Sequence, residues 1–599
     1  MKHLIIKIFA ALATGAVSLT AAAQQSFGAR GFVYDGLCYN ITGANSVEVI
    51  SRQEFGDCGQ YPVTVVIPAT VEHEGTTYTV TRIGDNAFNG CSTTSVTLPS
   101  TIEEIGRYAF STLRISSINL PASLRSIGFS AFFGCSRLSA MHLPASVSSI
   151  GAAAFSSTSI LEFTVDSANS TFCVVDGSLY NADTTVLIAL PAGNPSSSLT
   201  LPSSLRRIEA WAIGSNPQTI VLPQGLREIG EGALPLSIDT LHLPASVCRI
   251  EGNPVGQNPP ASLVVVVDEG NTHYTFADGR LTSSDGDTLL LVVGASGDYQ
   301  IPAGVKVLAN ELFYNNTALS SVTLPEGLTD IGEAAFLSTR CSVNLPSTLR
   351  RIGLQAFMMN SGMREVVIPA GVRVLERQTF SQSGVTSVVL PDSLRIVGRE
   401  AFNMCMSLTS LQLGSCLEEV HPKAFYTTNL NALPPLPTSL RTVGEKAFDG
   451  ILGDAEYVEF LGSPDTIGGA AFNMSEVRFR GSRPPVMIKD AFWRATTVHV
   501  PCGCSGAYST QQALAGKTIE EDCDGIDEVD STKIIISAQN GHISIYGALG
   551  EPVYIFDAVG RQIYHLASAS DEETVGIPCA GVYIVKVGNS QAKKIITIK

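Results

Sequence analysis

VTLPSTIEEIGRYAF, residues 96–110, is one copy of a unit that returns every 21 to 23 residues along most of this chain. Further copies are INLPASLRSIGFSAF at 118–132, MHLPASVSSIGAAAF at 141–155 and VTLPEGLTDIGEAAF at 322–336. A fixed period in the twenties is typical of a solenoid, in which each unit buries its apolar face only by stacking on its neighbours. The repeat therefore predicts a stacked array and points to recognition at an extended surface.

The unit itself predicts how each coil is built. Alternation in V-x-L favours a short strand with Val and Leu facing inward, and Pro ends that strand because it cannot donate a backbone hydrogen bond. The I-G-x-x-A-F segment then turns the chain, which we interpret as a single helical turn with Gly supplying an unusual backbone conformation. Since every coil runs the same way, neighbouring strands are expected to be parallel. The predicted fold class is an α/β repeat solenoid with high β content.

The residue after Ala in I-G-x-x-A-F is Phe in most units. A large ring at one fixed repeat position predicts a stacked column that forms the core of the array and not a ligand cleft. The column is expected at Phe88, Phe110, Phe132, Phe155, Ile213, Leu234, Val255, Phe313, Phe336, Phe357, Phe380, Phe402, Phe425, Phe448, Phe472 and Phe492. Thirteen of the 25 Phe residues of the chain stand in it.

Two stretches, near 165–193 and 267–295, interrupt the repeat and resemble each other. In both, Val-Asp precedes Asp-Gly by the same distance, and Asp-Gly between apolar runs is typical of tight hairpin turns. We interpret the stretches as paired hairpins that project from the array and divide it into three blocks.

The ends of the chain differ from the repeat. A charged start, an apolar run and a small-residue site near Ala23 predict a secretory signal peptide and hence an extracellular or outer-surface location. No later run of apolar residues is long enough to span a bilayer. The full set of expected segments is a signal peptide at 1–23, a strand-rich cap at 24–65, a repeat array of about 16 coils at 66–505, an acidic linker at 506–531 and a small antiparallel β-sandwich at 532–599.

Composition excludes several functions. A net charge of −16 argues against a nucleic-acid partner. The sequence lacks the H-E-x-x-H, phosphate-loop and G-x-S-x-G motifs of common enzyme classes. We therefore predict a protein with no catalytic residues, no metal site and no cofactor.

Outward residues of the V-x-L strands are the first candidate binding surface, because they form a column on the concave sheet. The column is mostly neutral, with small hydroxyls and amides that offer many weak hydrogen bonds. Its candidate residues are Thr97, Asn119, His142, His242, Thr323, Asn344 and Gln412. A solvated sheet face without a ligand is the alternative interpretation.

A second candidate surface is a stripe of Arg residues that follow the apolar position in L-R-x-I, here Arg350, Arg373 and Arg395. In register, successive guanidinium groups start about 5 Å apart and could bind an acidic or sulfated glycan. Solvated Arg side chains that cover apolar surface are the alternative.

The 13 Cys residues of an exported protein invite a disulfide interpretation. Cys91, Cys135 and Cys405 follow the column Phe at a fixed distance and are better explained as small core residues. The candidates for disulfides are Cys38 with Cys58, and the group Cys502, Cys504 and Cys523.

Segments such as AFFGCSRL from Ala131 and AFNMCMSL from Ala401 resemble the BspA-like class of bacterial leucine-rich repeats. That resemblance implies a right-handed leucine-rich-repeat superhelix on a secreted or surface protein that mediates adhesion or protein recognition on host matrix or other cells. The tail, with IYGALGEPVYIFDAVGRQIYHL and KKIITIK, resembles the C-terminal sorting domain of the type IX secretion route of Bacteroidetes. The alternative function is a glycan-binding or glycan-handling accessory protein that uses the inserted hairpins.

Overall fold

The computed structural model describes two units of the chain. They comprise residues 1–498 with 507–518, and residues 499–506 with 519–599. The described residues are 31–51, 61–191, 198–214, 217–488, 490–523, 535–539, 542–546, 552–557, 562–567, 572–576, 581–587 and 593–597. The predicted signal peptide lies outside them.

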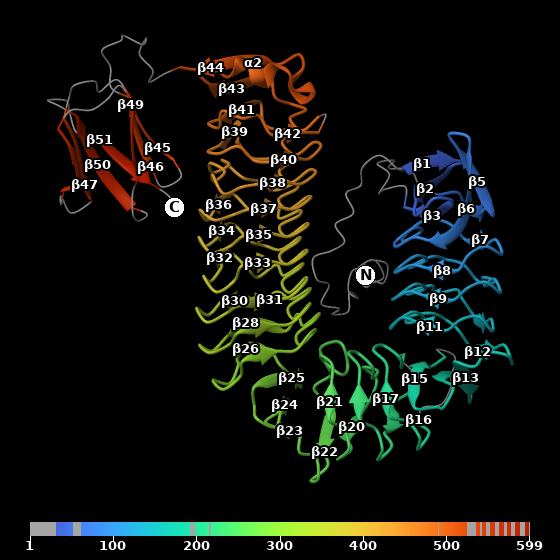
Figure 1. Cartoon of the computed structure of the whole chain (residues 1–599). Coiled ribbons are helices and arrows are strands. Elements are labelled where there is room, and N and C mark those ends of the chain that lie inside the picture. Colours follow the sequence, from blue (N-terminus) through green and yellow to red (C-terminus); the bar gives the residue numbers. More distant parts are fainter. Residues whose placement is uncertain are drawn as a thin grey trace. The chain divides into compact units, whose positions relative to one another are not determined.

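The V-x-L segments form the predicted parallel strands (Figure 1). Their Val side chains face the core, as Val322 and Val343, 2% and 5% exposed, illustrate. The strands of this ladder pair as β4 (Thr64–Val66) with β7 (Ser95–Thr97), β10 (Ala140–Leu143) with β12 (Glu162–Val165), β16 (Ser198–Thr200) with β18 (Thr219–Val221), β20 (Thr240–Leu243) with β22 (Val264–Val267), β26 (Gly297–Gln300) with β28 (Leu319–Thr323) and β30 (Ser342–Asn344), β32 (Glu365–Val367) with β34 (Ser387–Val389) and β36 (Ser410–Gln412), and β39 (Tyr457–Phe460) with β41 (Glu476–Phe479).

A second strand, which the sequence did not predict, precedes the Gly of each I-G pair. It is two residues long in most coils, too short for an alternating pattern to reveal it. Its members after β6 (Thr76–Ile83) are β8 (Glu104–Ile105), β9 (Ser126–Ile127) and β11 (Ser149–Ile150), then β17 (Arg207–Ile208), β19 (Glu228–Ile229) and β21 (Arg249–Ile250), then β27 (Val307–Leu308), β29 (Asp330–Ile331) and β31 (Arg351–Ile352), then β33 (Val374–Leu375), β35 (Ile396–Val397), β37 (Glu419–Val420), β38 (Thr442–Val443), β40 (Thr466–Ile467) and β42 (Val486–Met487). Most coils thus contribute to two parallel ladders.

The I-G-x-x-A-F segment forms turns, so the predicted helical turn is wrong. The residue before Ala-Phe adopts a left-handed backbone conformation, with φ of 52° at Tyr108 and 52° at Ala334, which a right-handed helix does not allow. The backbone N–H groups of the turn donate to the next coil instead, for example Tyr108 to Phe129 O at 3.0 Å and Phe110 to Ala131 O at 2.8 Å. These bonds make a third ladder along the array.

The Gly of I-G serves close approach and not an unusual φ. Gly128 lies outside the left-handed region. A Cβ on Gly128 would lie 2.6 Å from the carbonyl carbon of Gly106 and 2.7 Å from the nitrogen of Arg107, on the neighbouring coil. Glycine therefore sets the spacing of the coils here.

Replacing Gly128 by Ala should lower the free energy of unfolding by about 1–3 kcal/mol, because the new methyl group meets backbone atoms that cannot move independently. Gly304→Ala is the matched control, since a Cβ there meets nothing within 4 Å. Urea unfolding of both variants measures the difference. Equal losses in the two would contradict the close-approach explanation.

The predicted Phe column is present and buried. From Phe336 to Phe448 successive ring centroids lie 5.0 to 5.3 Å apart, with interplanar angles of 1° to 9°. Where the column contains Ile213, Leu234 and Val255, a cavity of about 290 Å³ lies beside these side chains, with Phe155 and Trp211 also in its wall. Smaller side chains leave space that a ring fills elsewhere.

The two interruptions are three-stranded antiparallel meanders, and the N-terminal segment has the same structure. Each first hairpin turns at Asp-Gly with both residues at positive φ, at 35–36, 176–177 and 278–279. The strands are β1 (Gly31–Tyr34), β2 (Leu37–Ile41) and β3 (Ser46–Ile50), then β13 (Phe172–Val175), β14 (Ser178–Asn181) and β15 (Val186–Ala189), then β23 (Tyr274–Ala277), β24 (Arg280–Ser283) and β25 (Thr288–Val292). The third strand of each pairs in parallel with β6, β17 or β27.

The meanders therefore do not simply project from the array, as the sequence suggested. Each one opens a block, and we call these the first block (β1–β12), the second block (β13–β22) and the third block (β23–β43). The Asp-Gly pair directly after a short strand, at 35–36 as at 176–177 and 278–279, is the sequence signal that relates the cap to the insertions.

The interval predicted as a linker begins with ordered structure. It contains α2 (Ser505–Ser509), η1 (Gln512–Leu514) and β44 (Thr518–Asp522), and β44 neighbours β43 (Thr497–Pro501) in one sheet. Residues 524–531 lie outside the described part of the chain.

The C-terminal strands form the predicted antiparallel sandwich. One sheet has the order β45–β46–β49 and the other β48–β47–β50–β51, and buried residues of both, such as Ile545 and Val585, share one core cluster. Its strands are β45 (Ile535–Gln539), β46 (His542–Tyr546), β47 (Val553–Asp557), β48 (Gln562–Leu566), β49 (Glu572–Gly576), β50 (Gly581–Val587) and β51 (Lys593–Thr597).

Candidate functional site

The outward side chains of the V-x-L strands form an exposed surface, which we call the V-x-L face. The predicted residues Thr97, His142, His242, Thr323, Asn344 and Gln412 lie on β7, β10, β20, β28, β30 and β36, and all are exposed. Asn119 is also exposed but lies outside a strand. Of these residues, Thr323 and Asn344 are direct register partners. The others belong to separate sheets and do not meet as one cluster.

The two histidines of the face occupy equivalent places, each on the last strand pair before a meander. His142 Nδ1 lies 2.9 Å from Thr164 Oγ1, and His242 Nε2 lies 2.7 Å from Asp268 Oδ1. Thr164 lies on β12 and Asp268 directly follows β22, so each ring has its partner beside it in its own block. The arrangement favours positioning of the rings within the face over a shared site.

In the third block the V-x-L face is a strip of small polar side chains with one exposed valine. Glu365, Ser387 and Ser410 are in register on β32, β34 and β36. Val367, on the same strand as Glu365, is 63% exposed. An exposed apolar side chain among hydroxyl groups can contribute burial to a contact whose polar rim supplies hydrogen bonds.

An aromatic and arginine pair, which sequence reasoning missed, lies on the strands β39 and β41. Arg478 Cζ lies 4.2 Å from the ring centroid of Tyr457, and Arg478 Nη2 donates to Glu476 Oε2 at 3.1 Å. Tyr457 is 38% exposed. Here the strand sequences are YVEF and EVRF, so the V-x-L pattern ends in Phe, and following V-x-F would have found the pair.

The predicted Arg stripe is partly neutralised. Arg350, Arg373 and Arg395 are all exposed, and the backbone N–H of Arg395 donates to Arg373 O at 2.9 Å, which places these two on neighbouring coils. The Arg395 guanidinium, however, forms an ion pair with Glu418 of the following coil. An anion would have to compete with that carboxylate.

Comparison with known families identifies the repeat. The model of the BspA type leucine rich repeat region matches in six copies, over residues 70–174, 297–405 and 351–478. These matches fall on the coils of the first and third blocks. The chain carries BspA-type leucine-rich repeats. A domain of unknown function (DUF6383) matches residues 525–597, which include the C-terminal sandwich.

Several solved structures are similar to this BspA-type array. A leucine rich cell surface protein from Faecalibacterium prausnitzii is 19% identical, with 64% of this chain and 94% of that chain covered and a TM-score of 0.32. A leucine-rich repeat protein from Eubacterium ventriosum is 17% identical over 69% and 92% of the two chains, with a TM-score of 0.29. One from Bacteroides ovatus is 22% identical over 82% and 99%, with a TM-score of 0.24. No curated protein matches the chain.

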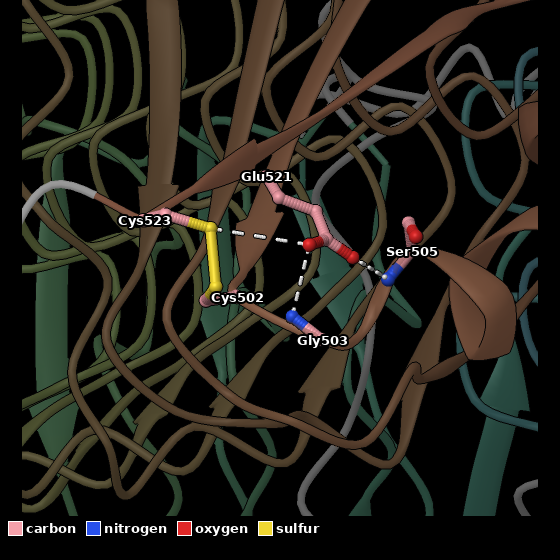
Figure 2. The surroundings of a disulfide bond; sticks show 5 residues. All are labelled: Cys502, Gly503, Ser505, Glu521 and Cys523. Carbon is pink, nitrogen blue, oxygen red and sulfur yellow. Dashed lines mark hydrogen bonds between the residues drawn. A yellow bond between two sulfur atoms is a disulfide. The ribbon is translucent and has the colours of Figure 1, made fainter. Parts of the chain in front are cut away.

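The cysteines after the BspA-type repeats form one disulfide, between Cys502 and Cys523, with the Cα atoms 4.8 Å apart (Figure 2). Cys504 keeps a free thiol. Glu521 lies beside the bond and accepts hydrogen bonds from Gly503 N at 3.0 Å and Ser505 N at 2.9 Å. The Ser505 side chain is the main cause that lowers the pKa of the Glu521 carboxyl, and these backbone bonds lower it further.

The same place is where potential metal ligands gather. Among the described residues, one group of side chains has ligand atoms mutually within 4.8 Å, and it consists of Cys502, Glu521 and Cys523. Both sulfur atoms are joined to each other, so neither offers the thiolate that a metal needs.

The first pair of disulfide candidates is not resolved by the structure, because Cys58 lies outside the described residues. Cys38 is buried, and its backbone N–H donates to Tyr61 Oη at 3.1 Å.

No described helix combines the length and apolar character needed to cross a membrane.

Proposed function

We propose that this chain is a non-catalytic recognition protein of the bacterial cell surface, which adheres to host matrix or other cells by binding partner proteins on its V-x-L face. The observation that supports this proposal most directly is the exposed strip of the third block together with the pair of Tyr457 and Arg478. BspA-type repeats support it, because leucine-rich repeats display extended surfaces for protein recognition. The likeness to a protein described as a leucine rich cell surface protein also supports it.

The chemistry of the face predicts how the binding energy is distributed. Small hydroxyl side chains such as Ser387 and Ser410 contribute little each, whereas Tyr and Arg dominate most protein interfaces. Tyr457 and Arg478 are therefore the anchor residues of the proposed contact. Display of many copies at a cell surface then strengthens a modest single contact through multivalency.

Export and attachment are part of the proposal. Residues 1–23 serve as the signal peptide, and residues 532–599 serve as a sorting or attachment domain, which their resemblance to type IX sorting domains supports. The protein is then extracellular or held at the outer surface. The DUF6383 match marks the second part as a recurring module.

The glycan-handling alternative gains no support from the meanders. Asp183 Oδ1 accepts a hydrogen bond from Thr185 Oγ1 at 2.6 Å, and Asp285 Oδ1 accepts one from Ser283 Oγ at 2.5 Å. These carboxylates hold their own turns, and their lowered pKa has the same cause. In this proposal the meanders therefore serve to begin each block and do not bind a glycan.

Replacing Arg478 by Ala should weaken binding of the full chain to a matrix protein about tenfold or more, because the change removes an anchor side chain. The measurement is surface binding to a panel of purified matrix proteins at low and high salt. Thr323→Ala is the control on the same face and should change affinity little. If no matrix protein or host cell binds the chain, or if both variants bind as well as the wild type, the proposal is wrong.

A further inference from the structure

The second and third blocks are joined through the turns that follow β21 and β27. The Asn253 N–H donates to Asn310 O at 3.1 Å, and Asn253 Nδ2 donates to Glu311 O at 3.2 Å. The Glu311 N–H then donates to Glu333 O at 2.8 Å. The ladder of turns thus passes directly from one block to the next and bypasses the meander between them.

Three glutamates gather at this junction. Glu311 and Glu333 are 1% and 7% exposed. The Glu231 carboxylate accepts a hydrogen bond from Asn310 Nδ2 at 2.8 Å, and Asn310 Oδ1 accepts one from the Glu333 N–H at 2.9 Å. One amide therefore links a glutamate of the second block to the first coils of the third block.

Gly252, on the coil between them, leaves the space for this link. A Cβ at Gly252 would lie 2.9 Å from Glu231 Oε2 and 3.2 Å from Asn310 Cβ. Any larger residue would meet the carboxylate or the amide. The absence of a side chain at this position is thus what lets Glu231 reach across to the third block.

Glu311 is the unusual member of the group. Its Oε2 atom is buried and has no hydrogen-bond partner among the described residues. Burial is the main cause that raises the pKa of Glu311 well above its ordinary value, and the charges of Glu231 and Glu333 raise it further. Burial is also the main cause that raises the pKa of Glu231. An unpaired buried carboxylate would be costly, whereas a protonated one can donate.

We propose that Glu231 and Glu311 share one proton, and that this hydrogen-bonded acid pair fastens the second block to the third only while it is protonated. One carboxyl O–H donates to the other carboxylate, and the Asn310 amide holds the acceptor in place. Loss of the shared proton leaves two like charges in a buried site, which repel each other. Proton binding therefore controls the junction.

Among the described residues, no ion pair joins a cation to Glu231 or Glu311. The Glu333 charge acts on Glu311 from the turn after β29, and the Glu251 charge acts on Glu231 from the residue that follows β21. Arg249 Nη2 lies 2.9 Å from Glu251 Oε1, and Arg207 Nη2 lies 3.3 Å from Glu251 Oε2, so these cations are engaged by Glu251. The buried Tyr314 phenol is another titratable neighbour, and the Glu311 charge adds to burial in raising its pKa.

The sign of the pH dependence follows from the raised pKa values. A glutamate whose pKa is higher in the closed junction than in the open one stabilises the closed form fully below its ordinary pKa. That stabilisation is lost as the pH rises toward the raised value. Over this interval the opening equilibrium increases about tenfold per pH unit for one shared proton. The junction should thus open preferentially in alkaline solution.

Hydrogen exchange of the full chain, followed by mass spectrometry between about pH 5 and about pH 8 and corrected for intrinsic exchange rates, tests the proposal. Protection at the Asn253 and Asn258 amides, which donate to Asn310 O and Tyr314 O across the junction, should fall about tenfold per pH unit in the wild type. The Phe357 amide, which donates to Thr379 O within the third block, should keep its protection. Glu311→Gln, a neutral isostere, should keep the junction amides protected at every pH.

Glu400→Gln is the matched control, because Glu400 occupies the same repeat position as Glu311 but lies in a coil away from the junction. Its carboxylate accepts a hydrogen bond of 2.6 Å from Gln378 Nε2. It should retain the wild-type pH dependence. Glu231→Gln provides a second neutral variant should Glu311→Gln fold poorly. Equal pH dependence in wild type and in either neutral variant would overturn the shared proton. Protection at high pH that calcium restores and EDTA removes would overturn it too, because a cation would then hold the carboxylates.

Discussion

Replacing Phe357 by Ala should lower the free energy of unfolding of the repeat array by about 3–5 kcal/mol. The Phe357 ring is fully buried and stacks between Phe336 and Phe380, with ring centroids 5.2 Å away on either side. Truncation removes two stacking contacts and leaves a cavity that the neighbouring rings, held by their own coils, cannot fill. The loss should therefore reach the upper part of the range for core Phe residues.

Urea unfolding followed by circular dichroism measures the change, with Phe357→Leu as the matched variant. The Phe357→Leu change is expected to lower the free energy of unfolding less than Phe357→Ala does. Leu234 occupies the same repeat position in the second block and is 1% exposed there, so a Leu side chain can be buried at this position. Coils contact only their neighbours, so exchange protection should fall around Phe357 and remain high in the first block. A uniform loss of protection along the whole array, or an equal cost for Ala and Leu, would contradict this view of the column.

Repetition explains why so much of the fold could be predicted from the sequence. A pattern such as V-x-L or A-F that recurs at one spacing reports the same inward position many times, so chance matches are suppressed. The column through Phe336 and Phe357 and the parallel V-x-L strands were predicted for this reason.

Features that depend on contact between coils were not predictable in the same way. The second strand has two residues in coils such as Glu104–Ile105 and shows no period. The sequence analysis interprets I-G-x-x-A-F as a single helical turn, but Tyr108 adopts a left-handed conformation and its N–H donates to the next coil. Gly128 was assigned a special φ, whereas its lack of a Cβ matters through the Gly106 backbone one coil away.

The candidate sites show the same limit. Thr323 and Asn344 could be placed on one face because their strands follow the pattern. Tyr457 and Arg478 were missed, since their strands end in Phe and no Leu-Pro follows them. The hydrogen bond between Glu231 and Asn310 joins residues 79 positions apart across a meander, and nothing in either local sequence indicates it.

Breaking the disulfide between Cys502 and Cys523 should destabilise the strands that it joins by about 3 kcal/mol, because the bond closes a loop with a sequence separation of 21 and so restricts the unfolded chain. Cys502 directly follows β43 and Cys523 directly follows β44, so the bond joins the ends of two neighbouring strands. Without it, β44 should separate from β43 at a lower temperature than the repeats unfold.

Limited proteolysis of the Cys523→Ser variant across a temperature series measures this, with cleavage expected first between residues 505 and 523. Cys504→Ser is the matched control, because Cys504 carries the free thiol and its loss leaves the bond intact. Wild-type protein treated with a thiol reductant should behave like Cys523→Ser. If Cys504→Ser is cleaved as early as Cys523→Ser, then Cys504 takes part in the bond, and the pairing of Cys502 with Cys523 would not be the one that holds these strands together.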